Sequence, residues 1–309
     1  MCLYPKLIKN KKYTKNKKNG GVIPAISDNR VLWVTAACGK CFECRKQKAR
    51  AWQVRMSEEL RENPNAIFVT LTISDEAFEY IMDKYQIETN EECCKKMIRL
   101  FLERVRKETG KSMKHWFITE IGHDNTERYH LHGIIWGIGI EEIVRRNWKY
   151  GFVFIGSFVN EQTINYVVKY MLKKDKDHKE YDPIVLCSAG IGAGYINRQE
   201  AKNNKFRGIH TKETYTLRNG TKLNLPIYYR NKIYTEEERE QLFIQKIDKG
   251  YVWICGEKVD INDQITYQKV LEYHQKEKQR LHGDDPQEWE IAKYLRRLDK
   301  QHQARKRTK

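Results

Sequence analysis

Two apolar segments, residues 116–121 and 129–136, constrain the fold of this chain more than any other feature. Both have the composition of β-strands, and the short polar stretch between them suits the turn of a hairpin. Antiparallel pairing places Glu120 opposite His130. Because side chains alternate across a strand, Glu120, His130 and His132 then leave the same face of the sheet. The sequence therefore predicts a hairpin that presents one carboxylate and two imidazoles together.

A helix is predicted further along the chain, over residues 165–174. An apolar stripe at three-to-four spacing supports this prediction, and it consists of Ile164, Val167, Val168 and Met171. Tyr166, Tyr170 and Lys173 fall on the opposite side, because residues four apart are stacked neighbours on a helix. Two phenols and a cation are therefore expected on one helix face.

The hairpin and the helix together indicate phosphodiester chemistry. A metal held by the histidine pair polarises a phosphodiester oxygen, and a nearby tyrosine oxygen can attack phosphorus to form a covalent intermediate. Tyrosine has a reference pKa of about 10, so it needs help from the metal or from a lysine. Lys169 and Lys173 are the candidates for that role, and Glu120 is the candidate third metal ligand beside the histidines.

Each of these interpretations has a simpler alternative. Glu120 can be an exposed hairpin carboxylate, the histidines can be ordinary sheet residues, and the two lysines can be surface residues. His123 is a weaker candidate ligand or a solvent-facing loop residue. A chain of this composition holds a His-x-His about 0.26 times and a Tyr-x-x-x-Tyr about 1.0 times by chance, so the information lies in their order, spacing and structural context.

Cysteines at positions 38, 41 and 44 form the least probable local pattern in the chain. Cys-x-x-Cys-x-x-Cys is expected only about 0.005 times by chance. Tetrahedral zinc accepts such thiolates but needs a fourth ligand. A redox pair or an iron–sulfur cluster is the alternative, although nothing nearby indicates electron transfer. The remaining cysteines are interpreted as unligated: Cys93, Cys94, Cys187 and Cys255.

The charge of the chain favours a polyanionic partner. There are 58 basic and 41 acidic residues, a net charge of +17, together with 18 Tyr and 7 Trp. This combination suits a nucleic acid with unpaired bases, and a well-solvated basic surface is the alternative. No segment approaches the roughly 18 apolar residues of a membrane span, and residues 1–18 lack the apolar run of a signal peptide. A cytoplasmic protein is expected, in which cysteines are thiols or metal ligands.

The rest of the chain predicts a mixed α+β domain with an antiparallel sheet. Further strands are expected at 66–73 and 151–155, and helices at 75–85, 89–109 and 141–147. Two segments toward the N-terminus are basic. Residues 1–30 suggest an extended basic arm or a disordered tail, and residues 44–61 a helix that lies along a phosphate backbone or is merely solvated.

The C-terminal third gives weaker signals. The glycine-rich loop 190–194 is suited to close approach of a phosphate, although it lacks the spacing of a nucleotide fingerprint. Residues 205–235 alternate Lys or Arg with Tyr, which predicts a hairpin that clamps single-stranded DNA or simply a soluble edge strand. Two tail helices are expected, the second of which opens at Asp285-Pro286 with Glu288 past its cap and ends in the basic residues 305–309.

These motifs resemble those of the HUH (His-hydrophobic-His) endonucleases that initiate rolling-circle replication. The similarity is greatest to the replication initiators of microvirus-type single-stranded DNA phages, in particular the gokushovirus branch. It covers most of residues 1–200 and is carried, in the same order, by the motifs at 38–44, 68–72, 128–132, 166–170 and 190–195. The family usually has proline before the first histidine, where this chain has Tyr129. The family also carries a cysteine near its start, so Cys2 would complete a zinc site with Cys38, Cys41 and Cys44.

The resemblance implies an α+β, HUH endonuclease fold with a central antiparallel sheet flanked by helices. An N-terminal cysteine-rich zinc module and a helical C-terminal tail would be added to it. On this basis residues 1–62 hold the basic arm, the cysteine module and a basic helix, and residues 63–190 the endonuclease core. Residues 191–309 hold a DNA-contacting hairpin and the helical tail.

The resemblance also implies a nickase-ligase that acts on single-stranded DNA at a replication origin. Glu120, His130 and His132 would hold Mg²⁺ or Mn²⁺, for which oxygen and imidazole ligands are suitable. Tyr166 or Tyr170 would form a 5′-phosphotyrosyl bond, and Lys169 and Lys173 would stabilise phenolate or phosphate charge.

The expected partners are the single-stranded origin and the helicase and polymerase of a bacterial host, in the host cytoplasm and away from membranes. Two other functions stay open. A transposase or relaxase of the same superfamily would differ in its DNA substrate. A non-catalytic, zinc-stabilised nucleic-acid-binding protein would bind DNA but never nick it.

Overall fold

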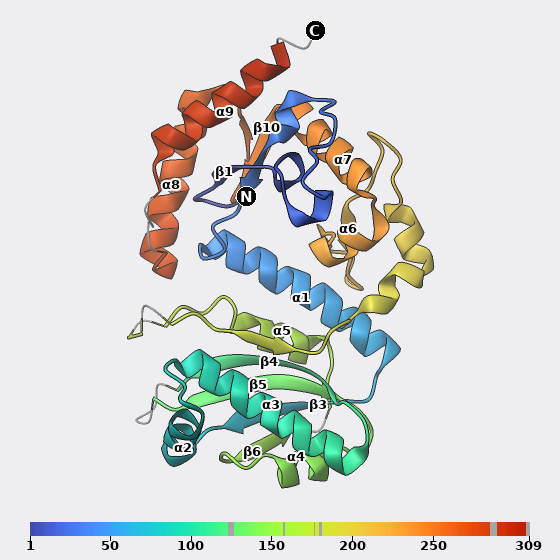
Figure 1. The fold of residues 1–309 in the computed structure, drawn as a ribbon, viewed down its shortest axis with the longest axis vertical. Helices are drawn as coiled ribbons and strands as arrows, with labels where there is room; N and C mark the ends of the chain where they lie inside the picture. The colour runs from blue at the N-terminus through green and yellow to red at the C-terminus, as the bar shows by residue number, and fades with distance from the viewer. Residues whose placement is uncertain (123–126, 157, 176, 179–180, 285–288, 307–309) are drawn as a thin grey trace. The chain divides into compact units, whose positions relative to one another are not determined.

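The computed structural model describes residues 1–309 apart from 123–126, 157, 176, 179–180, 285–288 and 307–309. The chain divides into two compact units (Figure 1). The sheet unit contains Ala49–Ala201 and Tyr215–Pro226, and the terminal unit contains Met1–Lys48, Lys202–Thr214 and Ile227–Lys309. Helix α1 (Phe42–Glu62) contributes residues to both.

A five-stranded antiparallel sheet forms the centre of the sheet unit, with the strand order β6-β3-β5-β4-β7. Its strands are β3 (Ala66–Thr72), β4 (Lys114–Ile121), β5 (Tyr129–Trp136), β6 (Val153–Gly156) and β7 (Val185–Cys187). The predicted hairpin is the β4–β5 pair, and β5 is the middle strand. The expectation of a mixed α+β fold around an antiparallel sheet is confirmed.

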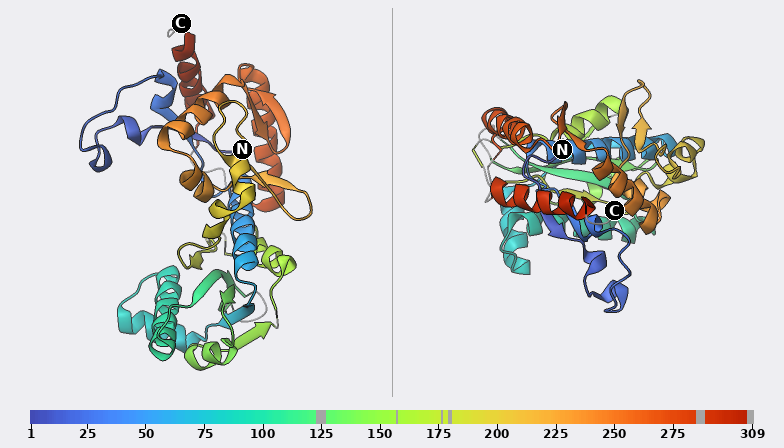
Figure 2. Two further views of the ribbon diagram at one scale, coloured as in Figure 1. Left: turned by 90° about the vertical axis from the view of Figure 1, so that its right-hand side faces the viewer. Right: turned by 90° about the horizontal axis from the view of Figure 1, so that it is seen from above.

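Helices cover both faces of this sheet (Figures 1 and 2). On one face lie α2 (Asp75–Tyr85), α3 (Asn90–Thr109) and α4 (Glu141–Asn147), which pack against Val69, Leu71, Phe117 and Leu131. On the other face lie α1 and α5 (Glu161–Lys169), which pack against Trp116, Ile118 and Ile134. Because Glu120, His130 and His132 have the parity of this second set, they share a face with α5.

The terminal unit is built from both ends of the chain. Its elements are β1 (Lys6–Lys9), β2 (Trp33–Ala36), α6 (Ile227–Ile233), α7 (Glu236–Asp248), β10 (Tyr251–Ile254), β11 (Glu257–Asp260), α8 (Gln264–His282) and α9 (Ile291–Lys306). Strands β1 and β2 pair antiparallel, as do β10 and β11. Figures 1 and 2 show the blue N-terminal segment beside the red C-terminal helices. Among the described residues, no helix is both long enough and apolar enough to cross a membrane.

The start of the chain differs from the predicted extended arm. Leu3, Tyr4 and Leu7 are buried in one apolar cluster with residues of α8 and α9. The indole of Trp289 donates a hydrogen bond of 2.6 Å to the Pro5 carbonyl oxygen. The hydrophobic partners of the first residues therefore lie at the far end of the chain, where a local pattern cannot indicate them.

Three other predictions are corrected or limited by the structure. Helix α5 ends at Lys169 rather than at residue 174, and a tighter turn continues to Leu172 through a hydrogen bond of 2.9 Å to the Lys169 carbonyl oxygen. A hairpin does form within 205–235, from β8 (Thr214–Thr216) and β9 (Lys222–Asn224), but Tyr215 and Tyr229 are buried and offer no ring to a base. The predicted start of the second tail helix, residues 285–288, and the basic residues 307–309 lie outside the described residues.

The glycine-rich loop 190–194 binds a carboxylate of the chain itself. The Gly192 amide donates a hydrogen bond of 2.9 Å to Glu59, whose other oxygen accepts one of 2.7 Å from Lys114. Glu59 is fully buried. An internal anion therefore occupies the position that the sequence suggested for a phosphate.

Candidate active site

The β4–β5 register agrees with the sequence prediction. Glu120 lies opposite His130, and Ile118 lies opposite His132. Close approach of the two strands requires Gly133, where an added Cβ would come within 2.4 Å of the Trp116 carbonyl oxygen and 2.3 Å of the Phe117 ring. The backbone thus brings the carboxylate and both imidazoles to one end of one sheet face.

His132 is held through both ring nitrogens. Its Nε2 lies 2.8 Å from Glu120 Oε2, and its Nδ1 lies 3.0 Å from the hydroxyl of Thr70 on β3. The residue is only 8% exposed. The ring orientation is therefore fixed by polar partners on both neighbouring strands.

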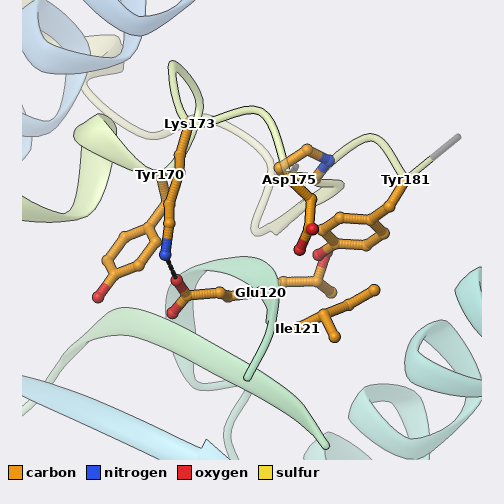
Figure 3. A pocket seen from close by; sticks show the side chains of 8 residues that line it. Glu120, Ile121, Tyr170, Lys173, Asp175 and Tyr181 are labelled. Atoms are coloured by element: carbon orange, nitrogen blue, oxygen red, sulfur yellow. Dashed lines mark hydrogen bonds and ion pairs between the residues drawn. The ribbon is translucent and has the colours of Figure 1, made fainter. Parts of the chain in front are cut away.

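Glu120 has a second cationic partner. The ammonium of Lys173 lies 2.5 Å from Glu120 Oε1, beside the Tyr170 ring (Figure 3). Burial raises the pKa of Glu120, but the hydrogen bonds from His132 and Lys173 outweigh burial and hold this pKa below its usual range. The carboxylate is accordingly ionised at neutral pH.

His130 is less tightly held than His132. The two imidazole rings stack at 6.4 Å between centroids with an interplanar angle of 17°. Burial, with the adjacent His132 as a further cause, lowers the pKa of His130, which favours the neutral imidazole that metals bind. His123, the weaker candidate ligand, lies outside the described residues.

The two tyrosines reach the histidines from α5. Asn160 caps this helix, and Ile164, Val167, Val168 and Met171 form its buried side, as the periodicity predicts. The hydroxyls of Tyr166 and Tyr170 lie 2.6 Å apart. The Tyr170 ring stacks on the His132 ring at 4.3 Å between centroids and 8° between planes.

The two phenols differ in environment. Tyr166 is 47% exposed, whereas Tyr170 is partly buried. Burial raises the pKa of Tyr170, and the hydrogen bond with Tyr166 and the negative charge of Glu120 raise it further. Tyr170 therefore keeps its proton in this arrangement, and its ionisation requires a change in the charge around it. Lys169 is exposed and takes no part in the hydrogen bonds described above.

A small pocket beside Glu120 includes residues that the sequence did not indicate. Thr119, Asp175 and Tyr181 line it together with Glu120, Tyr170 and Lys173 (Figure 3). The Tyr181 hydroxyl donates a hydrogen bond of 2.7 Å to Thr119. Residues 175–183 follow the tyrosine helix without any periodic pattern, so their return to the sheet gives no local signal.

The four cysteines of the predicted zinc site lie together in the terminal unit. The Sγ atoms of Cys2, Cys38, Cys41 and Cys44 are all within 4.8 Å of one another, and in the described part of the chain no other three or more candidate ligands are gathered as closely. Cys38 and Cys44 Sγ are 3.8 Å apart, and Cys2 and Cys41 Sγ are 4.0 Å apart. Zinc–sulfur bonds of about 2.3 Å give a tetrahedral edge of about 3.8 Å, whereas a disulfide requires about 2.05 Å. This cluster can hold a metal ion such as zinc.

Backbone amides support the same cluster. The amides of Tyr4 and Cys38 donate to the Cys2 sulfur at 3.3 and 3.2 Å. The amide of Cys41 donates to the Cys38 sulfur at 3.3 Å. Such donors stabilise thiolate charge, so the surroundings favour the ligand form of these cysteines.

Comparisons with known proteins agree with the location of the candidate site. Residues 66–175 match the family model of the phage replication-associated protein ORF2. The chain is 26% identical over 218 residues to the replication-associated protein VP4 of Bdellovibrio phage phiMH2K, a match that covers 63% of this chain and 66% of that protein. It is 27% identical over 228 residues to the replication-associated protein ORF2 of Spiroplasma virus 4, covering 63% of this chain and 69% of that protein. No solved structure matches the chain. The protein is therefore a relative of the replication-associated proteins of phages, as its motifs predict.

Proposed function

We propose that this protein is a site- and strand-specific DNA nickase and ligase that initiates rolling-circle replication. One observation carries the proposal: the Tyr170 ring stacks on His132, and the Tyr166 hydroxyl lies 2.6 Å from that of Tyr170. A pair of candidate nucleophiles thus lies against a candidate metal ligand. The similarity to replication-associated proteins of phages supports the same function.

The side chains around Glu120 fit a divalent cation such as Mg²⁺ or Mn²⁺. Glu120, His130 and His132 supply carboxylate oxygen and imidazole nitrogen, which both ions accept. The Lys173 ammonium 2.5 Å from Glu120 is already a positive charge on this carboxylate. When bound, the ion would polarise the scissile phosphate.

In the proposed reaction, the phenolic oxygen of Tyr166 or Tyr170 attacks phosphorus. A bond forms between that oxygen and phosphorus, and the bond from phosphorus to the 3′ oxygen breaks. The phenol loses its proton and the departing 3′ oxygen gains one, which leaves a 5′-phosphotyrosyl bond and a free 3′-hydroxyl. Lys173, with Lys169 as a second candidate, supplies positive charge for the phenolate or phosphate.

The second phenol gives the proposed enzyme a way to finish the cycle. After a polymerase has extended the 3′-hydroxyl, the other tyrosine can cut the regenerated origin. The free 3′-hydroxyl then attacks the first phosphotyrosyl bond and rejoins the strand. Two hydroxyls one helical turn apart suit this alternation.

We further propose that residues 63–190 have the HUH endonuclease fold and that the four cysteines hold a structural Zn²⁺. The strand arrangement, with the histidines on the middle strand and the tyrosines on a helix over the same face, supports the fold. The sulfur–sulfur distances support zinc. The zinc module at 1–62, a DNA-contacting role for 191–309, the host helicase and polymerase as partners and the host cytoplasm as compartment belong to the same proposal.

A cleavage assay tests this function. Purified protein is incubated with single-stranded origin DNA, labelled on the 3′ side of the expected nick, in Mn²⁺ and in EDTA. The expected result is a label that migrates with the protein under denaturing conditions in Mn²⁺ only. Binding without any nick would favour the non-catalytic alternative, and nicking only at a transposon end or transfer origin would favour the transposase or relaxase.

A further inference from the structure

Two exposed phenylalanines lie at the sheet edge beside the candidate active site. Phe152 is 69% exposed and Phe154 is 50% exposed. Phe154 belongs to β6, the first strand in the sheet order β6-β3-β5-β4-β7, and Phe152 directly precedes that strand. Large exposed aromatic side chains on a sheet edge are a liability for a protein unless they have a partner.

The strand register puts these two rings on the same sheet face as the histidines. Phe154 lies opposite Thr70 of β3, and Thr70 lies opposite His132. Phe152 exchanges backbone hydrogen bonds with Thr72, which lies opposite His130. Each histidine is thus joined across one threonine to one exposed phenylalanine.

Ring contacts connect the edge to the tyrosines. Phe68 of β3 packs edge-to-face against Phe154, at 6.3 Å between centroids, and against Tyr166, at 5.8 Å. Gly156 leaves room for the Phe68 ring, because an added Cβ there would lie 3.3 Å from it. The aromatic surface is therefore continuous from Phe154 to the candidate nucleophiles.

The backbone under this surface is firmly held. The Phe152 amide donates a hydrogen bond of 2.7 Å to the Thr72 hydroxyl, and the Phe152 carbonyl accepts one of 2.9 Å from the Thr72 amide. The Trp148 indole donates one of 2.9 Å to the Thr72 carbonyl. Rings on such a rigid support lose little entropy when a flat partner stacks on them.

We propose that Phe152 and Phe154 are a stacking platform for unpaired bases next to the phosphate that is cut. The occupant is single-stranded nucleic acid, because the platform is continuous with the proposed nuclease site and the chain carries a net charge of +17. This inference rests on the proposed function and deepens it: the two phenylalanines position the strand, while the histidines and tyrosines act on it.

Binding without cleavage tests the platform separately from the chemistry. Anisotropy of a labelled single-stranded oligonucleotide is measured in EDTA for the wild type, Phe152→Ala, Phe154→Ala and the double variant. Stacking of one base on one ring predicts a loss of affinity on the order of tenfold for each substitution. Phe154→Trp should retain the wild-type affinity, whereas Phe154→Leu, which stays apolar but cannot stack, should not.

Tyr80→Ala is the matched control, because Tyr80 is 58% exposed on α2, which covers the opposite sheet face. It should leave the affinity unchanged. Equal affinities for all variants would overturn the platform, even if the wild type still forms the covalent adduct, in which case the proposed function stands. Conversely, a wild type that binds through these rings but never forms an adduct removes the proposed function and keeps the platform.

A second copy of this chain is the competing occupant of an open sheet edge, and light scattering of the same variants tests it. The platform predicts the same oligomeric state for the wild type and Phe152→Ala/Phe154→Ala. Dissociation of a wild-type dimer by the double substitution, with unchanged DNA affinity, would overturn the proposal.

Discussion

Glu120 is the residue at which the polar contacts of the candidate active site meet. One carboxylate oxygen accepts from His132 and the other from Lys173. Lys169 lies one turn before Lys173 but is exposed and outside this network. The two lysines, which the sequence does not separate, therefore differ in their surroundings and form a natural pair for comparison.

Replacing Lys173 by Gln should slow adduct formation by at least about tenfold, because a positive charge beside the reacting groups is lost. Lys169→Gln should have little effect on the rate. Single-turnover cleavage at saturating DNA measures both, and thermal unfolding checks that the variants are folded. Equal rates for the two variants would remove Lys173 from the chemistry.

The β4–β5 hairpin shows how much of the fold local sequence determines. The alternation of side chains and a short connection fix which residues face each other, so the Glu120–His130 pairing was predictable. The stacking of Tyr170 on His132 was not, because it depends on how α5 packs across the sheet. The end of α5 was also missed, since the residues after Lys169 keep a helical pattern while the backbone tightens.

Gly133 tests the packing that this hairpin depends on. Gly133→Ala would push a methyl group into the Trp116 carbonyl and the Phe117 ring, and overpacking of this kind costs roughly 1–3 kcal/mol. Gly156→Ala on the edge strand is the control, because its methyl group would meet only the Phe68 ring, at 3.3 Å or more. We expect a clearly lower melting temperature for Gly133→Ala than for Gly156→Ala. Equal melting temperatures would mean that the two strands can separate without loss.

At the scale of the whole molecule, the terminal unit joins segments that are hundreds of residues apart in sequence. Cys2, Cys41 and Cys44 lie in the same apolar cluster as Tyr267, Leu271 and Leu298. The cysteine spacing predicted the cluster of thiols, but not that the first residues form the core of a unit with the C-terminal helices. Composition shows only that residues 1–30 are basic, and their few apolar side chains find partners at the other end of the chain.

Zinc binding should stabilise this unit. Elemental analysis is expected to find one zinc per chain in the wild type and in Cys255→Ser, whose cysteine borders the same apolar cluster without joining the four thiols. Cys41→Ser should lose the metal, and its terminal segments should become sensitive to protease, because metal binding and folding are coupled in such sites. Full zinc content in Cys41→Ser would contradict a four-cysteine site.

The most direct test of tyrosine-mediated cleavage is the Tyr166→Phe/Tyr170→Phe double variant in the denaturing adduct assay. The variant keeps both rings and removes only the hydroxyls, and Tyr181→Phe, in the neighbouring pocket, serves as the control. We expect no covalent adduct for the double variant, an adduct for Tyr181→Phe and for at least one of the single variants, and single-stranded DNA affinity within about twofold of wild type for all of them. An adduct that persists in the double variant would contradict the proposed role of these two tyrosines.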